Sequence, residues 1–253
     1  MLHGVVLSDL HLFTPRSRGL DYMDRIHDAM TGADALVLNG DIFDFPWTKL
    51  PDIDMAVDAA MNWLADLVRR FPESALHMVA GNHDCHQRYL DRLLPWVEAT
   101  PNVHFHEYVL RLDNCLFLHG DAANYTMSAE HLARLRRAAL REARKPDYAL
   151  KMLALSHRLG LVMAAHRLAF PRRRTVKRLL HFLRDYDPAA LEGVDHVYFG
   201  HTHLPFSGFS HEGLTFHNTG SGIVGMDFNM LAFTCNDADP VPLRTFRPAP
   251  DLG

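Results

Sequence analysis

Five short apolar segments of this 253-residue chain are each followed within two residues by Asp, His or Asn, and this pairing constrains the fold most. The segments are Val5–Leu7, Ala35–Leu38, Leu76–Ala80, Leu116–Leu118 and Val194–Phe199. Segments of this length and composition are typical of buried strands, and helical patterns alternate with them through the first half of the chain. The alternation predicts an α/β fold with its strands ending at a common edge.

Polar side chains of three kinds follow these segments. In chain order they are Asp9 and His11, Asp41 and Asp44, Asn82 to Asp84, His119 and Asp121, and His201 and His203. Ligands bind beyond the carboxyl ends of strands in open α/β sheets, so the five groups are expected to converge. One group alone is typical of a helix cap or a turn. Five such groups of Asp, His and Asn in this order, each at the end of a strand, predict a metal site.

The remaining patterns predict further helices and strands. We expect a helix over Asp54–Phe71, capped by Asp52 or Asp54 and ended by Pro72, and a second over Gln87–Leu94, stopped by Pro95. Helix formers fill the chain from Met127 to about Phe182, with breaks at Pro146 and Pro171. Strands joined by turns are expected at Phe206–Phe209, Leu214–His217, Met230–Cys235 and Leu243–Phe246.

Charge is distributed unevenly along the chain. The segment Met127–Asp185 holds 15 of the 26 Lys and Arg residues but only 4 of the 30 Asp and Glu residues. Such a segment suits phosphates or an anionic membrane surface, and the alternative is a solvated helical face. A nucleic-acid partner is disfavoured, because aromatic residues for base stacking are sparse there and the rest of the chain is acidic.

The cysteine and hydropathy patterns indicate the cellular compartment of the protein. Three cysteines without paired spacing suggest reduced thiols, and Cys85 is expected to be a packed thiol. The first strand follows Met1–Gly4 directly, so no secretory signal is expected, and no 18-residue apolar run predicts a membrane span. We therefore expect a cytoplasmic protein, with peripheral contact at the inner face of the membrane through the basic segment.

The five groups form an ordered series of motifs: Asp-x-His, Gly-Asp-x-x-Asp, Gly-Asn-His-Asp, His-Gly and Gly-His-x-His, from Asp9 to His203. This series resembles the calcineurin-like metallophosphoesterases. The resemblance implies an α/β fold, a four-layer α/β/β/α sandwich, as one domain over residues 1–253 with a basic helical insertion at about 125–187. It also implies hydrolysis of phosphoesters by a hydroxide that bridges two metal ions.

The resemblance further implies a ligand set for two divalent cations. One cation would be bound by Asp9, His11, Asp41 and His203, and the other by Asp41, Asn82, His119 and His201. Asp41 would bridge the two, and cations held in this way stabilise attacking and leaving oxygens at phosphorus. Imidazole, carboxylate and amide ligands without cysteine suit Mn²⁺, which we expect first, and also Fe or Zn²⁺.

Other residues are expected to act beside the metals. His83 would contact the phosphoryl oxygens or protonate the leaving group, with Asp84 orienting its ring as the second catalytic residue. Asp44 and Asp121 would orient ligand imidazoles, or be structural. Substrate contacts are expected from Asn124, Tyr125 and Arg158. Among the 18 histidines, His217 is a sixth candidate near the loop Asn218–Gly222, which could line the site, and His157 and His166 are expected to be ordinary polar residues.

Within the family, the layout is most similar to that of UDP-2,3-diacylglucosamine pyrophosphatases, hydrolases of the lipid A pathway. Ser8–Leu12 matches their Ser-Asp-Leu-His-Leu start, and a basic helical insertion stands in the same interval. Two positions differ, since His83 replaces an Arg and Ala122–Tyr125 replaces Cys-Thr-Asp-Asp. The likeness implies a lipid-linked or nucleotide diphosphate substrate. The alternatives are another phosphorylated substrate, such as a nucleotide or soluble phosphoester, and a non-catalytic scaffold.

Overall fold

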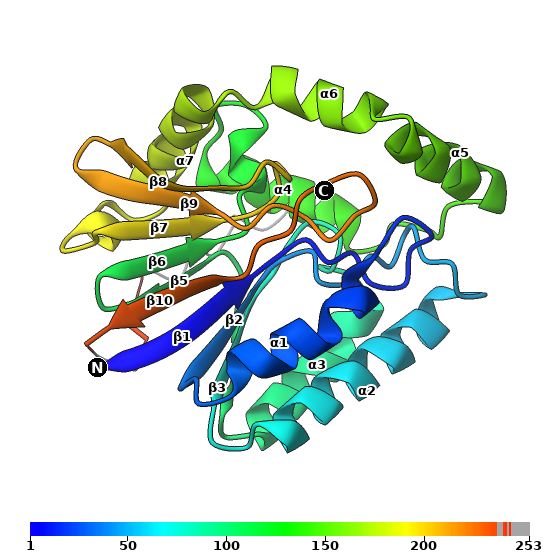
Figure 1. The fold of residues 1–253 in the computed structure, drawn as a ribbon, viewed down its shortest axis with the longest axis horizontal. Coiled ribbons are helices and arrows are strands. Elements are labelled where there is room, and N and C mark those ends of the chain that lie inside the picture. The colour runs from blue at the N-terminus through cyan, green and yellow to red at the C-terminus, as the bar shows by residue number, and fades with distance from the viewer. Residues whose placement is uncertain (237–239, 242, 244–253) are drawn as a thin grey trace, which may run out of the picture.

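Two five-stranded sheets form the centre of the fold (Figure 1). The computed structural model describes residues 1–236, 240, 241 and 243. The first sheet has the order β10 (Leu231–Cys235), β1 (Leu2–Leu7), β2 (Ala35–Asn39), β3 (Ala75–Val79) and β4 (Val103–His106). The second has the order β5 (Val109–Leu112), β6 (Cys115–Leu118), β7 (His196–Phe199), β9 (Leu214–Asn218) and β8 (Phe206–His211).

Seven α-helices among the described residues cover the outer faces of these sheets or extend from them (Figure 1). Three pack on the first sheet: α1 (Met23–Met30), α2 (Ile53–Arg70) and α3 (Gln87–Ala99). Two pack on the second sheet: α4 (Ala129–Ala139) and α7 (Arg172–Tyr186). The remaining two, α5 (Asp147–Arg158) and α6 (Leu161–Ala169), form an extended segment that we call the α5–α6 arm.

Alternation of side chains along each strand separates three hydrophobic clusters. In β2, Leu36 and Leu38 face the helices, whereas Val37 faces the second sheet. In β6, Phe117 enters the same middle cluster, where its ring stacks on Tyr198 at 5.0 Å between centroids. Three clusters between successive layers require four layers, so the expected α/β/β/α sandwich is confirmed.

Parallel pairing brings the strand ends together, as the sequence predicted. Strands β1 to β4 run parallel, as do β6, β7 and β9. The two sheets are joined at this edge by Asn39, whose Nδ2 donates to Leu118 O at 2.9 Å and Tyr198 O at 3.2 Å. The loops that follow five strands therefore open onto one region.

Two helix boundaries differ from the sequence prediction. Asp52 caps α2 by accepting from Met55 N at 2.8 Å, as expected, but α3 does not stop at Pro95 and continues to Ala99. Trp96 and Val97 pack on the same core as Leu93, and this burial offsets the backbone hydrogen bond that proline removes. Gly160, at φ 70°, adds an unpredicted break between α5 and α6.

Several elements lay outside the sequence prediction. Helix α1 and strands β4 and β5 are short, and the histidines of β4 hide its apolar pattern. The strand predicted at Leu243–Phe246 lies outside the described residues except for Leu243. The limits of the predicted insertion, residues 125–187, stay a prediction. Within the described part of the chain, no helix has the length and hydropathy needed to cross a bilayer.

A second group of histidines lies on β3 and β4, at the edge of the first sheet. His77 is buried in β3, with its ring stacked on His104 at 4.8 Å and its Nδ1 3.3 Å from His106 Nε2. Burial, with repulsion from the neighbouring imidazoles, lowers the pKa of His77 to about 3 and that of His106 to about 4. Both rings are therefore neutral in the folded protein at neutral pH.

These histidines should destabilise the protein in acid. Unfolded histidine binds a proton near pH 6.5 whereas folded His77 does not, so stability is present above pH 6.5 and is lost as the pH falls toward 4. We expect His77→Phe, which keeps an aromatic ring against His104, to reduce the fall in melting temperature between pH 7 and pH 5 by about 3 °C. Thermal melts should show no such change in the control His181→Gln, at an exposed position of α7.

Candidate metal centre

The residues predicted to bind metal lie together at the strand ends. Within each of three groups, the potential ligand atoms all lie within 4.8 Å of one another. The groups are Asp9, His11 and His203; Asp41, His119 and His201; and His11, Asp41 and His83. Asn82 joins the second group through its Oδ1, which lies 3.2 Å from His119 Nε2. The structure thus brings together every predicted ligand.

Five of these residues have left-handed backbone conformations. The φ angles are 53° at Asp9, 46° at His11, 52° at Asp41, 60° at His201 and 57° at His203. This conformation is unfavourable for residues with a Cβ, and such residues cluster at functional sites. The fold therefore holds these side chains toward one another at a cost in local stability.

Glycines of the motifs give these side chains room. A Cβ at Gly81 would collide with Asp41 Oδ1, and a Cβ at Gly200 would collide with Asp9 Oδ2. The requirement at both positions is close approach of the backbone to a carboxylate. This contact explains why glycine precedes Asn82 and His201 in their motifs.

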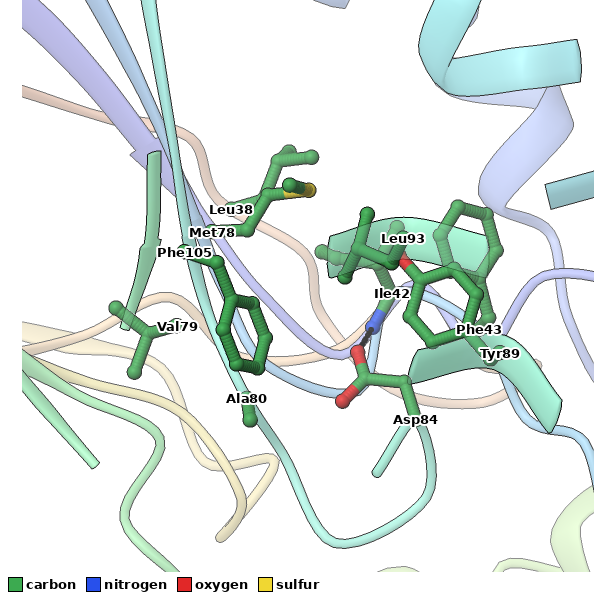
Figure 2. A pocket seen from close by; sticks show the side chains of 10 residues that line it. All are labelled: Leu38, Ile42, Phe43, Met78, Val79, Ala80, Asp84, Tyr89, Leu93 and Phe105. Carbon is green, nitrogen blue, oxygen red and sulfur yellow. Dashed lines mark hydrogen bonds between the residues drawn. The ribbon is translucent and has the colours of Figure 1, made fainter. Parts of the chain in front are cut away.

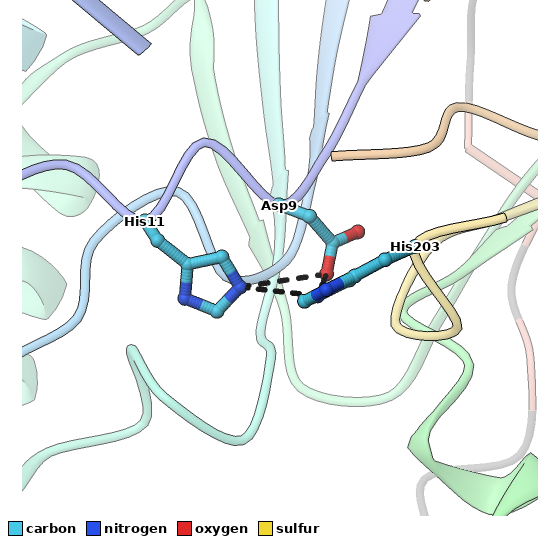
Figure 3. Close-up of side chains that lie close together, drawn as sticks. All are labelled: Asp9, His11 and His203. Carbon is cyan, nitrogen blue, oxygen red and sulfur yellow. Dashed lines mark hydrogen bonds and ion pairs between the residues drawn. The ribbon is translucent and has the colours of Figure 1, made fainter. Parts of the chain in front are cut away.

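The first group contains a buried carboxylate oxygen that faces two imidazole rings (Figure 3). Asp9 Oδ2 accepts from the backbone N of His201 at 2.9 Å, whereas the buried Oδ1 has no hydrogen-bond partner among the described residues. Asp9 Oδ1 lies 3.1 Å from His203 Nε2 and 3.8 Å from His11 Nε2. A buried, unpaired oxygen facing two imidazole nitrogens fits a bound cation.

Hydrogen bonds at the far side of two rings orient their free nitrogens toward the carboxylates. His11 Nδ1 lies 3.1 Å from Asp44 Oδ2, and His119 Nδ1 lies 3.2 Å from Asn39 O. Each contact uses an Nδ1 hydrogen, which leaves a lone pair on Nε2. In His119 that nitrogen is 3.2 Å from Asp41 Oδ2, an arrangement that a cation between them would stabilise.

Three carboxylates of the centre are held in the ionised form. Burial raises the pKa values of Asp9, Asp41 and Asp44, but the neighbouring imidazoles outweigh it and hold all three below their ordinary values. Three ionised carboxylates in a buried site need compensating positive charge. The residues present therefore fit two divalent cations, in both donor type and charge.

His83 is held by Asp44, which corrects the prediction for Asp84. The Nδ1 atom of His83 lies 3.0 Å from Asp44 Oδ1, and its backbone N donates to Asp41 Oδ1 at 2.8 Å. Burial lowers the pKa of His83, but Asp44 and Asp41 more than reverse this and raise it to about 9. The side chain is 25% exposed, so a substrate can reach a protonated imidazole.

Asp84 has a structural position instead. Its carboxylate accepts from Gly81 N at 2.7 Å and from Ile42 N at 3.0 Å, tying together the loops after β2 and β3 (Figure 2). It borders an apolar cavity of about 10 Å³, and burial with the nearby Asp41 raises its pKa to about 6. The prediction that Asp84 orients His83 is wrong, because these backbone N–H groups take its oxygens.

Asp121 and two of the three predicted substrate contacts have other partners. Asp121 forms a buried bidentate pair with Arg136 at 2.9 and 3.0 Å, so it is structural and orients no ligand. Asn124 Oδ1 lies 2.8 Å from His201 Nε2, and Tyr125 bonds His131 through its hydroxyl. Arg158 is exposed and has no contact with the centre among the described residues.

The candidates near the last parallel strand have other roles. His217 contacts His196 and Ser207 and stacks on Tyr198, so it lies outside the centre. In the loop Asn218–Gly222, the Ser221 hydroxyl and the backbone N of Gly222 both donate to Asp9 O at 2.9 Å. That loop therefore supports a predicted ligand. Cys85 is buried, as expected of a packed thiol.

Sequence reasoning missed the contacts of the α5–α6 arm with the centre. Arg16 Nη2 donates to Asp44 Oδ2 at 2.8 Å, and Arg16 Nη1 lies 3.1 Å from His157 Nε2 of α5. In α6, the ring of His166 stacks on His203 at 4.9 Å, and its Nδ1 lies 2.8 Å from Thr202 O. The expectation that both arm histidines are ordinary polar residues is wrong. No motif marked them, because the contacts join distant parts of the chain.

Loss of the Arg16 guanidinium should weaken the centre. Asp44 would lose the positive charge of the guanidinium while still contacting the imidazoles of His11 and His83. We therefore expect Arg16→Met to lower kcat about 10- to 100-fold. Steady-state kinetics and circular dichroism together would separate this loss from unfolding. Arg18→Met is the matched control, because Arg18 pairs with exposed Asp21. Equal activity of the two variants would show that Arg16 does not position Asp44.

A buried cluster of carboxylates, imidazoles and an amide at the strand ends of an α/β/β/α sandwich is the arrangement of a metal-dependent phosphoester hydrolase. The model of the calcineurin-like phosphoesterase family matches residues 4–205. The chain therefore belongs to this family, and it is a hydrolase that acts on phosphoester bonds.

Two solved structures match this chain in a structural comparison, at low sequence identity. Phosphopantetheinyl hydrolase from Mycobacterium tuberculosis is 14% identical, with 87% of this chain and 89% of that chain covered and a TM-score of 0.42. A dimetal phosphatase from Danio rerio is 15% identical, with 88% of each chain covered and a TM-score of 0.43. A comparison with curated proteins finds no match.

Proposed function

We propose that this phosphoesterase cleaves a lipid-linked or nucleotide diphosphate at a two-metal centre, in the manner of UDP-2,3-diacylglucosamine pyrophosphatases. The observation that carries the two-metal centre is the convergence of two ligand groups on Asp41. Its Oδ2 lies 3.2 Å from His119 Nε2 in one group and 3.8 Å from His11 Nε2 in the other. One carboxylate is therefore within reach of both groups.

The ligands divide between two divalent cations, for which we propose Mn²⁺, with Fe or Zn²⁺ as alternatives. Asp9, His11, Asp41 and His203 would hold one, and Asp41, Asn82, His119 and His201 the other. When bound, such cations acidify water and neutralise charge on phosphoryl oxygens. Asn124 supports this assignment, because its contact with His201 Nε2 leaves Nδ1 free to coordinate.

His83 would act as the general acid. Its Nδ1 is occupied by Asp44, so the proton it can transfer is on Nε2. As the bond between phosphorus and the leaving oxygen breaks, Nε2 would donate this proton to that oxygen. Asp44, held by Arg16, keeps the imidazole charged and fixed before the transfer and stabilises its orientation afterwards.

The α5–α6 arm supports a substrate with an apolar portion. Half of the most exposed large apolar side chains of the described residues lie in this arm: Tyr148, Met152, Leu155, Leu159, Leu161 and Leu168. Cationic residues of the same segment flank them. This combination suits acyl chains or the surface of an anionic membrane. We accordingly propose a cytoplasmic enzyme in peripheral contact with the membrane.

A substrate panel tests the proposal. The metal content of the purified protein is measured first, and the Mn²⁺-loaded enzyme is then given UDP-2,3-diacylglucosamine in detergent, bis-p-nitrophenyl phosphate and p-nitrophenyl phosphate. Chromatography should show release of UMP from the first substrate at a kcat/KM at least tenfold above the others. An intact lipid substrate beside rapid cleavage of the soluble esters would refute the proposed substrate and leave the phosphoesterase activity standing.

One observation favours a second candidate, a soluble nucleotide or phosphodiester substrate. His83 and the segment Ala122–Tyr125 depart from the pyrophosphatase pattern, and Asn124 contacts His201 rather than standing free for a substrate. Adding nucleoside diphosphates and cyclic nucleotides to the panel separates this candidate from the first. Preference for one of these soluble compounds would support it.

A further inference from the structure

A second concave site lies beside the metal centre, at the start of α7. It has a volume of about 550 Å³ and is lined by Thr126, Pro171, Arg173, Arg174, Lys177 and Arg178. Four of its six lining residues are cationic, and none is acidic. Its size is in the range of sites that bind small organic ligands.

The cations of this basic pocket lack acidic partners. Arg178 donates to the carbonyl oxygens of Ala123 and Asn124, both at 2.9 Å. Among the described residues, none of the four forms an ion pair with a carboxylate; Glu212, which acts on Lys177 at longer range, is paired with Arg184. The pocket therefore presents uncompensated positive charge to solvent.

The same cations repel one another along the helix. Arg173 and Lys177 are spaced i,i+4, as are Arg174 and Arg178, and like charges at this spacing destabilise a helix. Packing of the other face of α7, through residues such as Leu179 and Leu183, holds the helix in place. An anion between the two pairs would remove the repulsion, so the arrangement suits a bound anion better than an empty pocket.

Two contacts connect the basic pocket to the metal centre. Asn124, which accepts from Arg178 through its backbone, touches His201 Nε2 with its side chain at 2.8 Å. Phe170, next to the lining residue Pro171, lies 5.9 Å from the ring of His201. The pocket and the metal centre are therefore neighbours, with Asn124 and Phe170 between them.

We propose that the basic pocket is an anion subsite that binds a second phosphate of the substrate whose phosphoester is cleaved at the metal centre. The inference rests on the proposed function for the cleavage step. It assigns specificity to Arg174 and Lys177, which touch none of the predicted ligands. Substrates with a second phosphate should be preferred over otherwise identical substrates without one.

Binding of inorganic pyrophosphate in EDTA tests the pocket without relying on catalysis. EDTA removes metal ions that would themselves bind pyrophosphate at the centre, so the binding that is lost with the pocket cations reports on the pocket. We expect Arg174→Gln/Lys177→Gln to weaken binding about tenfold, and 0.3 M salt to weaken it in the wild type. The control Arg134→Gln/Arg141→Gln removes the same charge at exposed positions outside both the pocket and the α5–α6 arm and should bind within twofold of wild type. Equal binding by both variants would overturn the proposal, as would no binding by the wild type.

Kinetics with Mn²⁺ then test the role in specificity. The substrates are thymidine 5′-(p-nitrophenyl phosphate) and the same compound with a 3′-phosphate. We expect the 3′-phosphate to lower KM about tenfold in the wild type and the control, and to lose this effect in Arg174→Gln/Lys177→Gln with kcat unchanged. A 3′-phosphate without effect in the wild type would refute the subsite. Hydrolysis of neither compound would count against the proposed function, while pyrophosphate binding still decides whether the pocket holds phosphate.

Discussion

Asp41→Asn should abolish phosphoester hydrolysis, with kcat reduced at least about 10³-fold. The carboxylate lies within reach of both ligand groups, at 3.2 Å from His119 Nε2 and 3.8 Å from His11 Nε2. An amide of the same shape keeps the packing but removes the charge that both cations would share. Elemental analysis should therefore find fewer metal ions per chain, together with the loss of turnover.

The matched control for this substitution is Asp66→Asn. Asp66 forms exposed ion pairs with Arg69 and Arg70 on α2, far from the strand ends. It should keep the metal content and kcat of the wild type. Normal turnover in Asp41→Asn would refute the two-metal arrangement, and loss of activity with both metals retained would limit Asp41 to another role, such as holding the His83 backbone.

His83→Gln should retain metal and lose about 10²- to 10⁴-fold in kcat. No general acid would then protonate the leaving oxygen, and the loss in kcat should depend on how stable the leaving group is as an anion. An ester of p-nitrophenol, a stable anion, should be affected far less than an alkyl ester. Rates on this pair of substrates, with metal analysis of the same preparation, check the prediction. His181→Gln, at an exposed position of α7, is the control.

Two results would contradict this role for His83. Loss of metal would make His83 a ligand, as its place in a group with His11 and Asp41 allows. An equal loss on both esters would mean that the imidazole contacts the phosphoryl oxygens without transferring a proton. The second result would retain His83 at the site and remove the acid step from the proposal.

Local pattern predicted the strands and the residues that follow them. Val5–Leu7 and Ala35–Leu38 are apolar because they are buried on both faces, and the predicted ligands Asp9 and Asp41 come two and three residues after them. Parallel pairing then places these residues together without further information. The same reasoning failed at Pro95, where contacts of Trp96 and Val97 with the core sustain a helix beyond the proline.

Neighbours in sequence were a poor guide to neighbours in the site. Asp84 follows His83 directly, yet its carboxylate turns to backbone N–H groups, and Asp44 from another loop holds the imidazole. The partner of Asp121 is Arg136, in α4. In both cases a buried carboxylate accepts from whichever donors the fold leaves unsatisfied, and only the packed loops determine which donors those are.

The sequence by itself determined an α/β fold and the residues gathered at the strand ends, because these follow from hydrophobic pattern and from what comes after each strand. The order of the motifs indicated the family, and the resemblance to that family implied the four-layer architecture. Only the tertiary structure decided how those residues are supported. Arg16 and His157, 141 positions apart, meet beside Asp44, and five predicted ligands have left-handed backbones. Such contacts and conformations arise when distant segments pack together, so no local pattern specifies them.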